Sequence, residues 1–161
     1  MAVNFHRPHL VVLPEDDATR SLAVGFSDQV SGPMDIRKPS GGWPGVLQQF
    51  EQIYVAHLRK YADSHVLMLI DFDHQFPDRL THFQKEIPAD VAARVYILGA
   101  EDEAEALRRE QKLKFGPLGA QLAEECRQQE HAHWLCPQLA HNQPELARLN
   151  ASVRPFLFSR P

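Results

Sequence analysis

A continuous apolar run that ends in two aspartates limits most strongly what this chain can fold into. The run covers Val66 to Ile70 and is followed at once by Asp71-Phe72-Asp73. Apolar residues without polar alternation predict a strand that is buried on both faces, as in a parallel sheet covered by helices. In open α/β sheets, ligands bind at the carboxyl ends of the strands. We therefore expect the two aspartates at the functional edge of the fold.

Two other apolar runs end in acids in the same way. Leu10 to Leu13 is followed by Pro14 and then by Glu15-Asp16-Asp17, and Arg94 to Gly99 is followed by the acids of residues 101–105. Residues 34–38 predict a weaker strand between the first two. Segments with helical spacing alternate with these strands, which favours an α/β fold with a mostly parallel central sheet and helices on both faces.

The segments between the strands have the apolar spacing of helices. Asp16 or Asp17 is expected to cap the first helix, which carries Ala18, Leu22 and Phe26. A loop rich in proline and glycine is expected over residues 38–45. Further helices are expected over residues 46–61, 80–87, 104–107, 118–134 and 145–149, with a last apolar segment over residues 153–158.

The chain length and composition indicate one globular domain. The 161 residues, 43% of them hydrophobic, are enough for a real core, which we place at residues 10–115 with a C-terminal helical extension over residues 117–161. The net charge of -4 argues against passive adhesion to nucleic acid, although a nuclease can be acidic because bound cations supply positive charge.

The same composition predicts a cytoplasmic protein without membrane association. The two cysteines, Cys126 and Cys136, are too few for a disulfide scaffold and suit a reducing compartment. The sequence begins without a basic and apolar leader, and no apolar run is long enough to cross a bilayer.

The acids that follow the strands predict a site for a divalent cation. Glu15, Asp71, Asp73 and Glu101 come after three different strands whose carboxyl ends are expected at one edge. Mg²⁺ takes oxygen ligands and is commonly held by one or two carboxylates together with water and substrate phosphate. The alternative is that each acid caps the helix that follows it, because aspartate and the helix dipole favour that position.

The order of these acids resembles the Toprim domain of topoisomerases, bacterial primases and OLD-type nucleases. A glutamate after an early strand, a helix, and Asp-x-Asp after a later apolar strand form the resemblance, which covers Leu10 to Gly99. It implies a compact α/β fold with Mg²⁺ or Mn²⁺ held by Asp71 and Asp73, and with Glu15 as acid/base or further ligand. OLD-like members place further acids where this chain has Glu101. The sequence departs from the pattern because Asp16, not glycine, follows Glu15, and because residues 74–77 replace a turn that contains glycine.

This resemblance implies metal-dependent phosphodiester hydrolysis on nucleic acid, as in nuclease effectors of phage-defence assemblies. A loop tryptophan, Trp43, offers a stacking face for substrate, and Arg37, Lys38 and the Arg108-Arg109 pair are candidate cations for the transition state. The first alternative is a non-catalytic Toprim-like interaction subunit of a larger complex, for example with an ATPase. The second is a doubly wound sheet that binds a small phosphorylated ligand or accepts a phosphoryl group.

The histidines and cysteines allow further interpretations. His74 follows the paired aspartates and is a candidate third ligand or proton shuttle, or else an ordinary loop residue. Zinc is an alternative for the segment near the carboxyl end, although no Cys-x-x-Cys occurs there. The candidate zinc ligands are Cys126, His131, His133, Cys136 and His141. The tail after residue 134 is rich in apolar residues, so it either packs over the sheet or supplies a surface for a partner.

Overall fold

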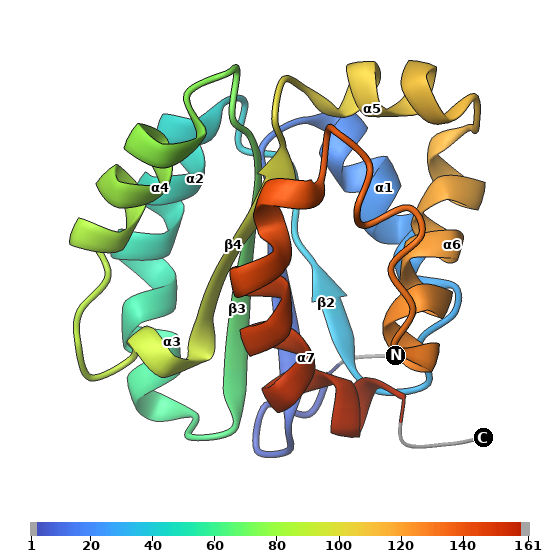
Figure 1. Ribbon diagram of the computed structural model, residues 1–161. Helices are drawn as coiled ribbons and strands as arrows, with labels where there is room; N and C mark the ends of the chain where they lie inside the picture. The colour runs from blue at the N-terminus through green and yellow to red at the C-terminus, as the bar shows by residue number, and fades with distance from the viewer. Residues whose placement is uncertain (1–2, 159–161) are drawn as a thin grey trace.

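Four parallel strands form one sheet between two layers of helices in the computed structural model, which describes residues 3–158 (Figure 1). The strands are β1 (His9–Pro14), β2 (Met34–Ile36), β3 (Ser64–Asp71) and β4 (Val95–Ala100). Every neighbouring pair is parallel, in the order β2-β1-β3-β4. The predicted parallel α/β sheet with helices on both faces is confirmed.

The strand order creates a switch point between β1 and β3. From β1 the chain first moves to β2 on one side, and it then returns to place β3 on the other side of β1. The register aligns Pro14 with Leu69 and Asp71 with Ala100, so β1, β3 and β4 end close together. In doubly wound sheets, ligands bind in the crevice at such a point. Glu15 and Asp71 lie on its two sides.

One face of the sheet is covered by the helices on the left of Figure 1. Here α2 (Trp43–Gln49) continues through a π-helical turn (Phe50–Tyr54) into α3 (Val55–Lys60), and α4 (Phe76–Lys85) packs beside them. The residues of β1, β3 and β4 on this face are buried, as the two-sided burial predicted from the apolar runs requires. Its core consists of Val11, Leu13, Val46, Leu47, Phe50, Tyr54, Leu58, Val66, Met68, Ile70, Phe72, Phe83, Val91, Val95 and Ile97.

The other face is covered by α1 (Asp17–Ser27), α6 (Phe115–Gln128) and α7 (Gln143–Leu157). A further helix, α5 (Ala104–Gln111), lies at the upper right of Figure 1, above α1 and α6. Gly119 lets α6 approach α1 closely, because a Cβ there would lie 2.2 Å from the Leu22 carbonyl oxygen. The main core residues of this face are Leu10, Val12, Leu22, Leu67, Tyr96, Leu98, Leu107, Leu118, Leu122, Trp134, Leu146 and Val153.

Several predicted boundaries are wrong because proline is accepted in the first turn of a helix. The loop expected over residues 38–45 ends at Gly42, and Pro44 lies in the first turn of α2, where its missing N–H breaks no helical hydrogen bond. Likewise α6 begins at Phe115 rather than at Leu118, and it ends where Gln129 adopts a left-handed conformation. The two segments expected near the carboxyl end form one helix, α7.

Side chains of α7 take the place of a further strand along the outer edge of β4. Asn142 accepts a hydrogen bond from the Gly99 N–H at 3.2 Å and donates one to its carbonyl at 2.9 Å. The Glu145 carboxylate accepts from the Ile97 N–H at 3.0 Å. The edge of the sheet is thereby satisfied without another strand.

The apolar tail packs back over the sheet, which is the first of the two alternatives for this segment. Its buried residues are Trp134, Leu139, Leu146, Leu149, Val153 and Leu157, whereas Leu135 is exposed. Within residues 3–158, no helix is both long and apolar enough to cross a membrane.

Candidate functional site

The candidate site begins where β1 ends, at Glu15. The Glu15 N–H continues the pairing with β3 by donating to the Leu69 carbonyl at 3.0 Å. The Glu15 carbonyl accepts from the N–H groups of Gly41 at 2.9 Å and Gly42 at 3.2 Å. The positive φ angles of these two glycines, 83° and 144°, are readily adopted only by glycine. The loop before α2 is therefore fixed over the end of β1.

The Glu15 side chain is buried between the two strand ends. It is 8% exposed, and its carboxylate accepts a hydrogen bond from the Asp71 N–H at 2.5 Å. Burial raises the pKa of Glu15, and the negative charges of Asp16 and Asp73 raise it further, while the N–H groups of Asp71 and Trp43 oppose this shift. Glu15 thus joins β1 to β3. Its carboxyl group ionises less readily than that of a surface glutamate.

Asp71 is the most perturbed acid of the site. The residue is 7% exposed, and one carboxylate oxygen accepts from the N–H of Ala104, the first residue of α5, at 2.9 Å. Burial, followed by the charges of Asp16 and Glu15, raises the pKa of Asp71 to about 8. Without a cation, Asp71 is therefore largely protonated at neutral pH.

A strained turn carries the second aspartate of the pair. Asp73 and His74 have φ angles of 50° and 62°, in the left-handed region that costs energy for residues other than glycine. The loop after β4 holds the turn, because the Asp73 N–H donates to the Asp102 carbonyl at 2.9 Å and the His74 N–H to the Glu101 carbonyl at 2.7 Å. These bonds allow the turn to form without the glycine that the Toprim pattern has at this place.

An arginine that the sequence did not single out lies against both aspartates. Nη1 of Arg79, in α4, donates to the Asp73 carboxylate at 2.8 Å and to the Asp71 carbonyl at 3.1 Å. Its guanidinium group lies 4.8 Å from the centre of the Trp43 ring. The only signal in the sequence was the position of Arg79 in the first turns of the helix that follows Asp73.

The three arginines that were considered from the sequence have other contacts. Arg37 pairs with Asp35 at 3.3 Å, and Arg108 pairs with Glu105 at 3.0 Å. Arg109 is 3.9 Å from Glu103. Trp43, expected as a stacking face, already contacts Arg79 and the rings of His82 and Phe83.

Glu101 has its side-chain contacts with two histidines. One carboxylate oxygen lies 3.9 Å from Nδ1 of His74, and the other lies 3.7 Å from Nδ1 of His141. Nε2 of His141 is bonded to the Gly99 carbonyl oxygen at 2.7 Å, so it carries the hydrogen. The structure thus brings together Glu15, Asp71 and Asp73, with Asp16 beside them, whereas Glu101 forms a group with His74 and His141.

The two cysteines considered as zinc ligands resist ionisation, and His133 has another partner. Burial raises the pKa of the Cys126 thiol to about 12 and that of the Cys136 thiol to about 11. Nδ1 of His133 lies 2.5 Å from the buried Glu125 carboxylate. Across residues 3–158, no three side chains of His, Cys, Asp or Glu are grouped so that they could hold a metal ion.

A cation at the acidic edge would therefore have one or two protein ligands at a time. That is the usual way in which Mg²⁺ binds, with water and substrate phosphate as its other ligands. A carboxylate has about four acceptor positions. The Asp71 carboxylate uses one for the Ala104 N–H, and the Asp73 carboxylate accepts from Arg79. One or two of the Glu15, Asp71 and Asp73 carboxylates, but within residues 3–158 not all three at once, therefore suit a hard divalent cation.

Helix capping accounts for part of the acidic edge. Asp16 and Thr19 form a capping box, in which the Asp16 carboxylate accepts from the Thr19 N–H at 2.9 Å and the Thr19 hydroxyl accepts from the Asp16 N–H at 3.1 Å. The bond from Ala104 to Asp71 is also a contact with a helix start. Asp73 instead pairs with Arg79.

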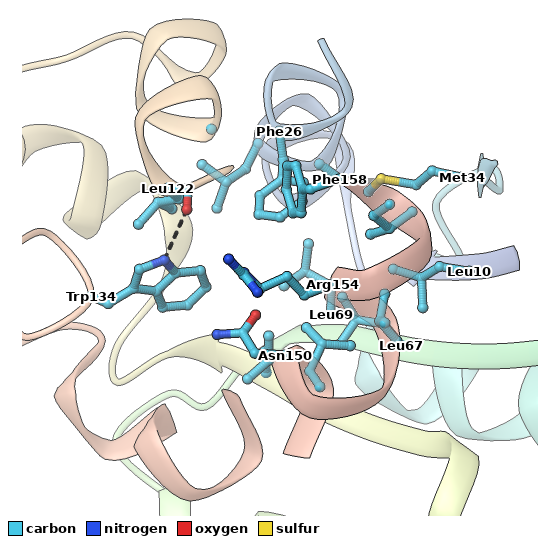
Figure 2. Close-up of a pocket in the computed structure, with 17 residues that line it drawn as sticks. Leu10, Phe26, Met34, Leu67, Leu69, Leu122, Trp134, Asn150, Arg154 and Phe158 are labelled. Carbon is cyan, nitrogen blue, oxygen red and sulfur yellow. Dashed lines mark hydrogen bonds between the residues drawn. The ribbon is translucent and has the colours of Figure 1, made fainter. Parts of the chain in front are cut away.

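The main apolar cavity lies away from this edge, between the sheet and the α1, α6 and α7 layer (Figure 2). Its volume is about 60 Å³, well below the roughly 150 Å³ of an apolar cavity that binds benzene. The Trp134 ring lines it and donates from Nε1 to the Leu122 carbonyl at 3.0 Å. Arg154, beside it, donates to the carbonyls of Cys126 and Arg127. The cavity is therefore too small for a ligand of the size of benzene.

Comparison with known proteins finds no matching family model, no matching curated protein and no matching solved structure. The four-stranded parallel sheet with flanking helices is compatible with a Toprim-like domain. The argument for function therefore depends on the geometry of the acidic edge.

Proposed function

We propose that the edge between β1 and β3 binds Mg²⁺ or Mn²⁺ and that the chain hydrolyses phosphodiester bonds. The observation that supports this is the pair of buried carboxylates of Glu15 and Asp71, next to Asp73, at the switch point of the sheet. Burial and the negative charges of neighbouring acids raise the pKa values of Glu15 and Asp71. A divalent cation relieves such repulsion, so cation binding and deprotonation of these acids favour each other.

Each residue has a role in this proposal. Asp71 and Asp73 hold the cation, and Glu15, the second buried carboxylate, accepts a proton from the attacking water or adds a ligand. The bound cation supplies charge stabilisation to the phosphate group. Nucleic acid is the proposed substrate, and an ATPase of a phage-defence assembly is the proposed partner. Because the chain is acidic overall, binding of nucleic acid should depend on the cation.

The second candidate is a non-catalytic interaction subunit with the same fold. The observation that favours it is that carboxylates of Asp16 and Asp71 accept hydrogen bonds from the N–H groups of Thr19 and Ala104, close to the starts of α1 and α5. In this case the acids stabilise helix starts, and no cation is required.

Thermal unfolding and cleavage assays with added Mg²⁺ or Mn²⁺ separate the two candidates. For the proposed enzyme, millimolar cation should raise the melting temperature of the wild type, and Asp71→Ala and Asp73→Ala should abolish both this rise and cleavage of DNA or RNA. Asp90→Ala is the matched control, because Asp90 is exposed and pairs only with the exposed Arg59 within the described residues. Cleavage that is equal in wild type and both variants would exclude the proposed site.

A further inference from the structure

Arg79 occupies an unusual position for a surface arginine. Only 13% of its side chain is exposed, and it lies between the two strand-end aspartates and the ring of Trp43. Within residues 3–158, both hydrogen bonds that its side chain donates come from Nη1. Nε and Nη2 therefore keep N–H groups that are available for another acceptor.

The surface beside Arg79 is open enough to admit a ligand. Trp43, Asp73, Gln75, Asp78, Arg79 and His82 line a hollow that is open to solvent. The hollow shares Asp73 with the proposed cation site, and Arg79 forms part of its wall. A group held by a cation at Asp73 would therefore lie within reach of the guanidinium group.

The charges of this hollow suit a phosphate group only after a cation has bound. Without a cation, Arg79 neutralises Asp73, and Asp78 adds a further negative charge to the same hollow. Arginine binds phosphate through two parallel N–H groups of its planar fork. A divalent cation at Asp73 neutralises the carboxylate and weakens the ion pair that holds Nη1, which keeps its bond to the Asp71 carbonyl.

We propose that Arg79 is the phosphate-binding residue of this site and that cation binding at Asp73 releases it for that role. The proposal rests on the proposed function, because it requires Asp73 to be a cation ligand. Arg79 competes with the cation for Asp73 when phosphate is absent, and it joins the cation in holding phosphate when both are present. Binding of the cation and binding of phosphate are then cooperative, and each raises the affinity for the other by the same factor.

If Arg79 moves from Asp73 to phosphate, the substitution Arg79→Gln should raise the Mn²⁺ affinity without phosphate and remove the effect of phosphate on that affinity. Arg79→Gln removes the competitor for Asp73, so Mn²⁺ without phosphate should bind about two- to fivefold more tightly than to the wild type. Inorganic phosphate should raise the Mn²⁺ affinity of the wild type about tenfold but leave that of Arg79→Gln almost unchanged. Arg79→Lys keeps the positive charge but lacks the fork, so its phosphate effect should be at least about threefold smaller than that of the wild type.

The experiment is a Mn²⁺ titration of the full chain, followed by the electron paramagnetic resonance signal of free Mn²⁺, with and without inorganic phosphate. A titration without protein corrects for Mn²⁺ bound by phosphate alone. Arg59→Gln is the matched control, because Arg59 also pairs with an aspartate, Asp90, and is exposed. Circular dichroism verifies that each variant is folded, and Arg79→Lys serves alone if Arg79→Gln is not.

The outcomes separate the two proposals. If the wild type binds no Mn²⁺, the proposed cation site is wrong and the role of Arg79 is wrong with it. If the wild type binds Mn²⁺ and the phosphate effect is equal in wild type, Arg79→Lys and Arg79→Gln, the cation site stands and the role of Arg79 is refuted. A phosphate effect that is lost in Arg79→Gln but kept in Arg59→Gln supports both proposals.

Discussion

Replacing Asp71 by asparagine should stabilise the cation-free protein. Asparagine keeps a side-chain oxygen that can accept the hydrogen bond from the Ala104 N–H, and it removes the group that repels Asp16 and Glu15. The charged form of a buried acid costs stability when nothing compensates it. Buried acids that lower the stability of a protein are often kept because its function requires them.

The pKa of Asp71 sets the size of the gain in unfolding free energy that we expect from Asp71→Asn. Its rise from 3.8 to about 8 means that the folded state resists ionisation that the unfolded chain undergoes freely. At pH 7 the solution lies about three pH units above the pKa of Asp71 in the unfolded chain. At 1.36 kcal/mol per unit, the destabilisation of the folded state is at most about 4 kcal/mol. Water reaches part of the carboxyl group, so we expect about 2 kcal/mol. For a chain of this size, that is a rise in melting temperature of about 4–8 °C.

The sign of the pH dependence follows from the same shift. The pKa of Asp71 is higher in the folded state than in the unfolded chain. The wild type therefore has its full stability, as far as Asp71 is concerned, below pH 3.8 and loses it progressively as the pH rises to about 8. Asp71→Asn should not show this loss. The gain from the substitution should therefore be small at pH 5 and largest near pH 8.

Urea unfolding followed by circular dichroism, in EDTA at pH 5, 6, 7 and 8, measures this effect. Asp90→Asn is the matched control, because Asp90 is exposed and its pKa is lowered by Arg59 rather than raised. If Asp71→Asn has the same stability as the wild type at pH 8, or a lower one, Asp71 is not a destabilising buried acid and the reasoning is refuted.

Three further predictions concern the fold. Glu145→Ala should lower the free energy of unfolding by about 1–3 kcal/mol in urea, because it leaves the Ile97 N–H at the edge of β4 without its acceptor; an unchanged midpoint would contradict this. Burial lowers the pKa of His65 to about 4, so the wild type should lose stability as the pH falls from 6.5 towards 4; His65→Asn should lose less over this range, and equal losses would argue against the shift. Gly99→Ala should fail to fold or lose more than about 3 kcal/mol, because its Cβ would lie 1.8 Å from the Ile70 carbonyl oxygen; a stable variant would mean that the strands are not packed as described.

The sheet and the position of the acids could be predicted because they depend on local patterns. The apolar run Val66 to Ile70 had to be buried on both faces, and Asp71 had to follow it at the carboxyl edge. Burial of both faces by helices is confirmed, and so is the cap of α1 by Asp16. These features require only the residue types and their spacing.

The rest depends on contacts between distant segments. The choice of Arg79 over Arg37 or Arg108 as the partner of the aspartates depends on how α4 is rotated against the sheet, which spacing does not fix. Glu101 faces His74 and His141 because the loop after β4 is bonded to the turn at Asp73, a contact across the sheet edge. The start of α2 was missed because residues 38–45 were interpreted as a loop, and the start of α6 at Phe115 was placed a few residues late, after Pro117.

Isothermal titration calorimetry with Mn²⁺ tests the cation site most directly. We expect saturable binding to the wild type at pH 7.5, with release of protons as Asp71 ionises, and no saturable binding to Asp71→Ala or Asp73→Ala. Asp90→Ala should bind as the wild type does. Absence of saturable binding to the wild type, or equal binding to all four proteins, would contradict a cation site at the edge between β1 and β3.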